Sequence, residues 1–218
     1  CGPPVVLWLH REEPRMASPQ RPNIVFIMAD DMGFSDIGCY GSEICTPNVD
    51  SLAEDGLQFT QMYNSARCCP SRAALLTGLN PQQTGVGHMV ANLGWPGYQG
   101  YLNESSVTIA EGLKSNGYAT MMSGKWHVGG TYDLLDPASW TPGDATHPIP
   151  TQRGFDRFFG IVTGAGSFYY PLTLMRDDQL IPLEADGFYF TDAISDNAVD
   201  MIEDAAQGDA PFFLHIAY

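Results

Sequence analysis

Short apolar runs that alternate with amphipathic segments constrain the fold of this chain more than any other feature. "PNIVFIMADD" (22–31) is continuously apolar before its two carboxylates, which is typical of a buried strand in a central parallel sheet. Three further runs are strand-like: 57–63, 118–127 and 211–218. Helix-like segments lie between the runs, at 46–56, 71–78, 106–117 and 191–206. The alternation predicts an α/β fold with a mixed, mostly parallel central sheet and helices on both faces.

The helix-like segments carry signals for where they begin and end. Thr46 is a candidate N-cap with Pro47 in the first turn, and Ser106 is a candidate cap for the segment that Gly117 ends. Gly78 is a stop signal for 71–78. Two segments carry an apolar face, which predicts that they pack on the core: Val49, Leu52 and Ala53; Ile194, Ala198, Met201, Ile202 and Ala205. Residues 128–190 are rich in Gly, Pro and aromatics, which predicts long loops with short elements.

Composition and charge exclude some classes of partner. The chain has 218 residues, 44% of them hydrophobic, so it can bury a substantial core. Its formal net charge of −15 argues against nucleic acid and anionic membranes, because both require a basic surface. The longest apolar runs, 5–9 and 24–28, fall far below the ~20 residues that a membrane span needs.

The two ends of the chain differ in what their sequences predict. Residues 1–20 lack the basic start of a secretory signal, and we expect them to be a disordered leader outside the core, with 21–218 as one catalytic-domain portion. Met16 is a plausible start, which would imply a cytoplasmic protein, whereas a lost signal would imply a periplasmic or secreted one. The chain stops on a core strand, which we expect at the sheet edge, so the domain is expected to be truncated at its C-terminal side.

The five cysteines, at positions 1, 39, 45, 68 and 69, are too few and too unevenly spaced for a disulfide framework. The sequence has no CxxC and no Cys/His spacing typical of a zinc site. Cys39 and Cys45 are interpreted as buried free thiols, with pairing as the alternative. A redox pair of Cys68 and Cys69 is disfavoured because adjacent cysteines close a strained ring.

Polar groups fall where predicted strands end, and ligands of open α/β sheets bind beyond those ends. The groups are Asp30-Asp31 after 22–28, Cys68 to Arg72 after 57–63, and Lys125 to His127 at the end of 118–127. Pro70 in a first helical turn and the fixed charge of Arg72 favour an anionic nucleophile or ligand. Taken singly, the aspartates are more often caps, the thiols inert, and a loop lysine or histidine solvated.

Several ordered motifs resemble one enzyme family. "CCPSRAALLTG" (68–78) matches the sulfatase signature C-x-P-S-R-x-x-x-L-T-G, and "GYATMMSGKWHVG" (117–129) resembles the second signature. "PNIVFIMADDMGFSDIGCYG" (22–41) and "RGFDRFFG" (153–160) resemble bacterial arylsulfatases in the same order. The resemblance covers about 21–218 and implies the N-terminal portion of a catalytic domain with an alkaline-phosphatase-like sheet.

The resemblance implies a mechanism and a role for each site residue. A maturase would convert Cys68, two positions before Pro70, into formylglycine, whose hydrate attacks the sulfur of a sulfate ester and later expels sulfate; Cys69 occupies a free position. The substrate would be an aryl sulfate or a sulfated sugar. Asp30, Asp31 and the modified Cys68 would bind Ca²⁺, with Mg²⁺ as the alternative. The other catalytic residues would be Arg72, which orients the hydrate, Lys125, which contacts the sulfate oxygens, and His127, which moves a proton.

Other readings stay open. His215 lies within a strand and is interpreted as a buried structural histidine, and His88 as a loop residue rather than part of a substrate mouth. The family's later metal-binding pair, histidine and lysine are not among these residues, so this chain alone is expected to be inactive. A phosphonate monoester or phosphodiester hydrolase of the same superfamily is the nearest alternative. A non-catalytic Ca²⁺-binding relic with unmodified Cys68 is another.

Overall fold

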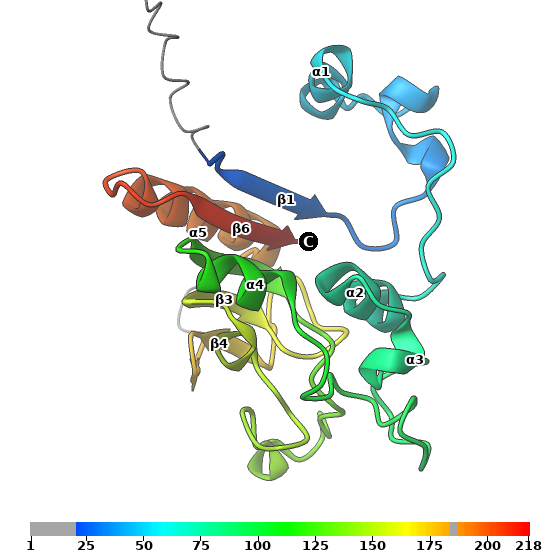
Figure 1. Cartoon of the computed structure of the whole chain (residues 1–218), viewed down its shortest axis with the longest axis vertical. Helices are drawn as coiled ribbons and strands as arrows, with labels where there is room; N and C mark the ends of the chain where they lie inside the picture. The colour runs from blue at the N-terminus through cyan, green and yellow to red at the C-terminus, as the bar shows by residue number, and fades with distance from the viewer. Residues whose placement is uncertain (1–20, 184–186) are drawn as a thin grey trace, which may run out of the picture.

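The computed structural model describes residues 21–183 and 187–218, so the predicted leader at 1–20 lies outside the described residues. One six-stranded sheet organises the chain, in the order β1-β6-β2-β3-β4-β5 (Figure 1). Its strands are β1 (Ile24–Met28), β2 (Ala119–Lys125), β3 (Arg157–Ile161), β4 (Leu174–Arg176), β5 (Gln179–Leu180) and β6 (Phe212–Ala217).

The sheet is mixed and mostly parallel, as the sequence predicts. β6 pairs in parallel with β1 and β2, and β2 pairs in parallel with β3, whereas β4 and β5 are antiparallel. The expectation that the last strand lies at an edge is wrong: β6 sits between β1 and β2. Every residue of β6 is buried, which explains why its sequence is apolar on both faces.

Five α-helices accompany the sheet in the described residues: α1 (Pro47–Asp55), α2 (Cys68–Thr77), α3 (Pro81–Thr84), α4 (Ile109–Ser115) and α5 (Phe190–Ala205). Short 3₁₀ turns lie at Phe34–Asp36, Gly38–Tyr40, Pro137–Ser139 and Pro150–Arg153. In the described ranges we find no helix with both the length and the hydropathy that crossing a membrane requires. The described residues between 128 and 190, which are 128–183 and 187–190, form loops with short elements, as predicted.

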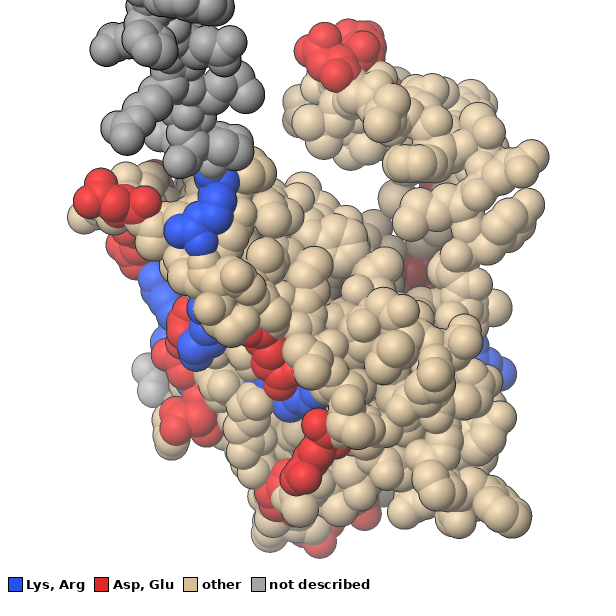
Figure 2. Space-filling view, viewed as in Figure 1, with Lys and Arg blue, Asp and Glu red and all other residues tan. Residues whose placement is uncertain are grey.

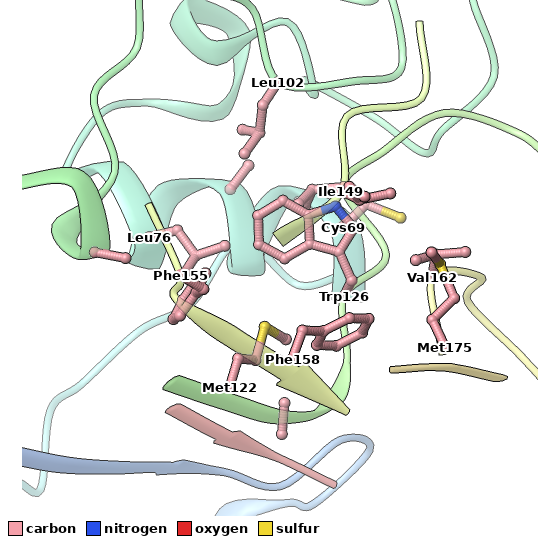
Figure 3. Close-up of a cluster of buried hydrophobic side chains, with 14 of the residues drawn as sticks. Cys69, Leu76, Leu102, Met122, Trp126, Ile149, Phe155, Phe158, Val162 and Met175 are labelled. Atoms are coloured by element: carbon pink, nitrogen blue, oxygen red, sulfur yellow. The ribbon is translucent and has the colours of Figure 1, made fainter. Parts of the chain in front are cut away.

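Helices cover both faces of the sheet and create two cores. On one face, Met122 and Phe158 of the sheet pack with Trp126, Phe155 and residues of α2 and α4 (Figure 3). On the other, α5 buries the face predicted from its sequence, with Ile194, Ala198 and Met201 against Leu214 and its neighbours. Alternate residues of β6 therefore serve opposite cores.

The N-cap of α4 lies two residues later than the sequence predicts. Thr108, rather than Ser106, is the N-cap: its hydroxyl accepts from the Glu111 N–H at 3.0 Å, while the Glu111 carboxylate accepts from the Thr108 N–H at 2.7 Å. The Ser106 hydroxyl instead donates to the Asn103 carbonyl at 2.9 Å. A reciprocal capping box satisfies two helix-end groups, so it outcompetes a single upstream serine.

The predicted strand at 57–63 is wrong. These residues form an irregular loop without a pairing strand among the described residues, and Leu57 and Tyr63 are 86% and 88% exposed. An apolar run becomes a strand only where a neighbouring strand satisfies its backbone. The prediction therefore failed because the sequence does not show what lies beside it.

Two further predictions of burial are wrong on the same side of the molecule. The sequence predicts that β1 is a buried strand, but it is an edge strand in the described sheet, with Val25 46% and Ile27 55% exposed. α1 forms where predicted, yet Val49 and Leu52 of its apolar face are exposed.

Cys39 and Cys45 are free thiols, as predicted, but Cys39 is only half-buried and Cys45 is exposed. The interpretation as buried core thiols is therefore wrong for both.

Two glycines allow β2 and β3 to approach closely. Gly124 and Gly160 are register partners, and a Cβ on Gly160 would lie 1.7 Å from the Gly124 carbonyl oxygen, at a φ of +153°. We predict that Gly160→Ala lowers the free energy of unfolding by on the order of 3 kcal/mol, because strand pairing must distort. Urea unfolding measures the change.

The matched control is Gly112→Ala in α4, where an added Cβ meets no atom within 4 Å. It should raise the free energy of unfolding by roughly 0.5–1 kcal/mol, because alanine is the better helix former. Equal effects of the two substitutions would contradict the close-approach explanation.

His215 is a buried structural histidine, as predicted. Its ring stacks on Phe26 with centroids 5.0 Å apart, and Nδ1 lies 3.2 Å from the Phe26 carbonyl oxygen. Burial lowers the pKa of His215 to about 4 from the ordinary value of 6.5. The uncharged ring is therefore the form that the folded chain retains.

This depressed pKa predicts an acid dependence of stability. Above pH 6.5, His215 makes no pH-dependent contribution to the free energy of unfolding. As the pH falls from 6.5 towards 4, His215 is protonated in the unfolded chain but stays uncharged in the folded chain, so the folded state becomes less stable. We expect His215→Leu to make the loss of unfolding free energy between pH 7 and pH 5 smaller by about 2 kcal/mol. His88→Gln, at an exposed loop histidine, should leave the loss unchanged. Equal pH profiles for the His215 variant and the parent would refute the assignment.

Candidate active site

The polar groups predicted at strand ends meet at one edge of the sheet. β1 and β2 both run parallel to β6, so their carboxyl ends lie at the same edge. Asp30 and Asp31 follow β1, and Lys125 is the last residue of β2. The third group arrives differently from the prediction: Cys68 begins α2 after an irregular loop rather than after a strand.

Asp30 joins the other two segments by ion pairs. Its Oδ2 pairs with Lys125 Nζ and lies 3.5 Å from Arg72 Nη2. Burial by itself raises the pKa of Asp30, but the Lys125 hydrogen bond and the Arg72 charge outweigh it and hold that pKa below its ordinary value. Asp30 is therefore a carboxylate at neutral pH, and the two cations are held in place.

Arg72 retains unused hydrogen-bonding capacity. Its side chain is 1% exposed, and Nη1 donates to the Lys125 carbonyl oxygen at 2.7 Å. Its Nε and Nη2 have no hydrogen-bond acceptor. Because an unsatisfied buried donor costs free energy, these atoms are suited to an additional anionic acceptor. In Figure 2 the surface over α2 and α3 is largely uncharged on the face shown, whereas Arg72 and Lys125 are buried cations.

The position of His127 is fixed by the buried residue that precedes it. Trp126 is buried in the core, where its Nε1–H donates to the Pro148 carbonyl at 2.7 Å, and the next residue turns back towards α2. Burial first, and then the charges of Lys125 and Arg72, lower the pKa of His127 to about 3. The imidazole is therefore uncharged at neutral pH and can accept a proton.

Cys68 and Cys69 occupy the first turn of α2, with Pro70 third, so the helix begins three residues before the predicted start at residue 71, while Pro70 lies in the first turn as predicted. Cys68 lines a cavity of about 280 Å³ that His127 also lines. Cys69 is fully buried, and its Sγ lies 3.2 Å from His127 Nε2. Burial raises the pKa of the Cys69 thiol to about 12, so Cys69 stays protonated.

The predicted metal ligands fit Ca²⁺ in kind but not in number. Asp30 and Asp31 provide the hard oxygen ligands that Ca²⁺ prefers, whereas Ca²⁺ takes about 6–8 oxygens. Within the described ranges, only Cys68, Cys69 and His127 form a group of three or more acidic, thiol or imidazole ligands within 4.8 Å of one another. Asp30, Asp31 and Cys68 therefore do not form such a compact set.

Backbone strain concentrates around the site. Asp31, Ala66 and His127 have φ values of 52°, 61° and 55°, in the left-handed region that non-glycine residues rarely adopt. Each lies in or just before a segment that carries a predicted site residue. Such strain persists only where the surroundings impose it, and it is common at functional sites.

Two residues that shape the site, Gly164 and Met89, were not predicted from the sequence. A Cβ on Gly164 would lie 1.9 Å from His127 Nε2, so only glycine leaves room for the ring. Met89 lies with its Sδ 3.7 Å from Cys69 Sγ. Neither residue belongs to a recognised motif, and no spacing signal links them to Cys68. His88, beside Met89, is exposed and absent from the cavity lining.

The fold is that of a sulfatase. The family model described as "Sulfatase" matches residues 22–218, and the chain belongs to the sulfatase family.

Individual relatives give the same result. The chain is 36% identical over 216 residues to an arylsulfatase of Klebsiella aerogenes, covering 93% of this chain and 43% of that protein. It is 43% identical over 148 residues to human arylsulfatase A, covering 67% of this chain and 26% of that protein. The chain thus spans less than half the length of these relatives.

Solved structures share the architecture. Ps i-CgsB, in complex with k-i-k-neocarrahexaose, superposes with a TM-score of 0.74 at 31% identity, over 91% of this chain and 45% of that one. BT4656, in complex with D-glucosamine-2-N,6-O-disulfate, gives a TM-score of 0.67 at 30% identity, over 90% and 34% of the two chains. The predicted alkaline-phosphatase-like fold is confirmed.

The clearance at Gly164 gives a direct test of how His127 is held. We predict that Gly164→Ala displaces the imidazole, so that its pKa rises from about 3 towards 6.5 as the ring becomes exposed. NMR titration of the His127 ring measures the change. Gly166→Ala is the matched control, because its Cβ would meet no atom closer than 3.8 Å. An unchanged His127 titration in Gly164→Ala would disprove the positioning role.

Proposed function

We propose that this chain supplies the cysteine-bearing part of an active site that hydrolyses a sulfate ester to sulfate and an alcohol or phenol. The observation that carries the proposal is the position of Cys68: it starts α2 and opens onto the same cavity as His127. Arg72 and Lys125 lie beside it with their charges fixed by Asp30. Membership of the sulfatase family supports this reaction class.

In the proposed reaction, Cys68 acts after a maturase has converted it into formylglycine. The hydrated aldehyde supplies a nucleophilic hydroxyl for the attack on sulfur and a second hydroxyl for the release of sulfate. The uncharged His127 imidazole accepts a proton from that group. Access to Cys68 through the cavity suits both modification and catalysis.

The two cations stabilise negative charge on the substrate. Among the described residues, Arg72 Nε and Nη2 have no hydrogen-bond acceptor, although Nη2 forms an ion pair with Asp30, and a tetrahedral anion provides acceptors for both. Lys125, whose side chain is 11% exposed, contacts the sulfate oxygens in the proposed complex. Because both groups are fixed by Asp30 before substrate arrives, little reorganisation is needed in the transition state.

We propose Ca²⁺ as the metal, with Mg²⁺ as the alternative, held by Asp30, Asp31 and the modified Cys68. A bound cation supplies Lewis-acid activation at the site. Asp30 and Asp31 offer only part of the about 6–8 oxygens that Ca²⁺ takes, so the site needs further oxygen ligands. We therefore expect the 218-residue chain by itself to turn over no aryl sulfate, even with Cys68 converted.

The proposed substrate class is an aryl sulfate or a sulfated sugar. The arylsulfatase relatives support the former. The neighbouring structure that holds D-glucosamine-2-N,6-O-disulfate supports the latter. Both present the same tetrahedral head to Arg72 and Lys125, so the geometry that carries the proposal serves either.

The position of the modified residue is directly testable. We predict that co-expression with a formylglycine-generating maturase converts the Cys68 side chain from CH₂SH to CHO, because Cys68 stands two positions before Pro70. Peptide mass spectrometry measures the conversion. Cys69→Ala should still be converted, whereas Cys68→Ala should not. A thiol at Cys68 in the co-expressed chain would favour the non-catalytic relic.

Turnover then identifies the reaction. A longer protein that contains this chain and is converted at Cys68 should hydrolyse an aryl sulfate or a sulfated sugar in preference to an aryl phosphonate monoester. Preference for the phosphonate would overturn the sulfate assignment in favour of the alternative hydrolase. Lys125→Gln should lower kcat/KM by about 10²–10³-fold, as expected for a lost transition-state contact.

A further inference from the structure

The buried environment of Cys69 contains more metal-binding groups than the sulfatase reaction uses. Cys69 Sγ lies 3.2 Å from His127 Nε2 and 3.7 Å from Met89 Sδ. The sulfur of Cys68 and the ring of His127 lie within the same 4.8 Å group. Two thiols, an imidazole and a thioether thus converge from three separate segments of the chain, although the sequence shows no metal-binding spacing.

We propose that, while Cys68 is an unmodified thiol, Cys68, Cys69, His127 and Met89 bind one Cu(I) ion. The inference goes beyond the proposed sulfatase function, because it concerns the chain before Cys68 is modified. Cys68 and Cys69 each give up a thiol proton as the metal–sulfur bonds form, and copper remains Cu(I) throughout. No oxidant or reductant is consumed.

The dimensions of the cluster suit a single ion. Donors that each lie about 2.3 Å from one ion are separated by ~3.8 Å in tetrahedral geometry and ~4.6 Å when opposite each other. The 3.2 Å contact of Cys69 with His127, the 3.7 Å contact of Cys69 with Met89, and the 4.8 Å limit on the atoms of Cys68, Cys69 and His127 therefore need only small side-chain rotations. The cavity of about 280 Å³ lined by Cys68, Met89 and His127 provides a path of entry.

The donor types select the ion. Thiolate and thioether sulfur favour Cu(I), whereas Ca²⁺ and Mg²⁺ require oxygen ligands. Zn²⁺ is the closest competitor, since it accepts thiolate and imidazole, but the thioether of Met89 adds little to a zinc site.

The positively charged residues near the cluster also favour Cu(I) over Zn²⁺. Two thiolates on Cu(I) form a complex with a net negative charge, whereas the same thiolates on Zn²⁺ form a neutral one. Arg72 lies one turn along α2 from Cys68, and Lys125 precedes His127 by two residues. These fixed positive charges stabilise the anionic cuprous complex more than the neutral zinc complex.

The test uses the 218-residue chain made without a maturase, with Cys1, Cys39 and Cys45 each replaced by serine. Titration under anaerobic, reducing conditions against the Cu(I) chelator bicinchoninate measures stoichiometry and affinity. We expect one Cu(I) per chain, and we expect Cys69→Ser to weaken binding at least ~10-fold. Met89→Leu should weaken binding, whereas Met62→Leu, at a methionine that is 73% exposed, should not.

Three results would overturn the proposal: failure to compete with the chelator, equal affinity in the Cys69→Ser chain, or tighter binding of Zn²⁺ than of Cu(I). A second measurement avoids any loss of folding in the variants. In the chain that retains all its cysteines, Cu(I) should protect Cys68 from iodoacetamide, as read from peptide masses, and Ca²⁺ should not. Alkylation of Cys68 at the same rate with and without Cu(I) would also overturn the site.

Discussion

The carboxylate of Asp30 is the point on which the site depends. It pairs with Lys125 at the end of β2 and with Arg72 in α2, and so connects three segments far apart in the sequence. Removing one partner of a buried ion pair leaves an uncompensated charge, which costs several kcal/mol. Arg72 is fully buried and Lys125 nearly so; their positions near Cys68 therefore require this carboxylate.

Close backbone approach is the second constraint. His127 adopts a left-handed φ of 55° between the buried Trp126 and the loop that contains Gly164. The ring occupies space that any side chain at Gly164 would fill. The same principle acts in the sheet, where Gly124 and Gly160 face each other. The site is thus built on strained, tightly packed backbone, and the packing of the core on the α2 face holds it in that form.

Two kinds of metal ligand lie close together around α2. Asp30 and Asp31 offer oxygen ligands of the kind that Ca²⁺ uses, and Cys69, Met89 and His127 offer sulfur and nitrogen. In our proposals, residue 68 binds Ca²⁺ together with Asp30 and Asp31 once it is formylglycine. While it is a thiol, it binds Cu(I) together with Cys69, Met89 and His127. The chemical state of one side chain would then decide which class of ion the site prefers.

Local periodicity, helix caps and ordered motifs were enough to predict the α/β class, the helix that begins at Pro47, the strands β1, β2 and β6, and the family. Features that depend on neighbouring segments could not be predicted in this way. Residues 57–63 have a strand pattern but no partner to pair with, and β6 occupies the interior because β1 and β2 flank it. The contacts of Cys69 with His127 and Met89 join residues distant in the chain, and only packing in three dimensions brings them together.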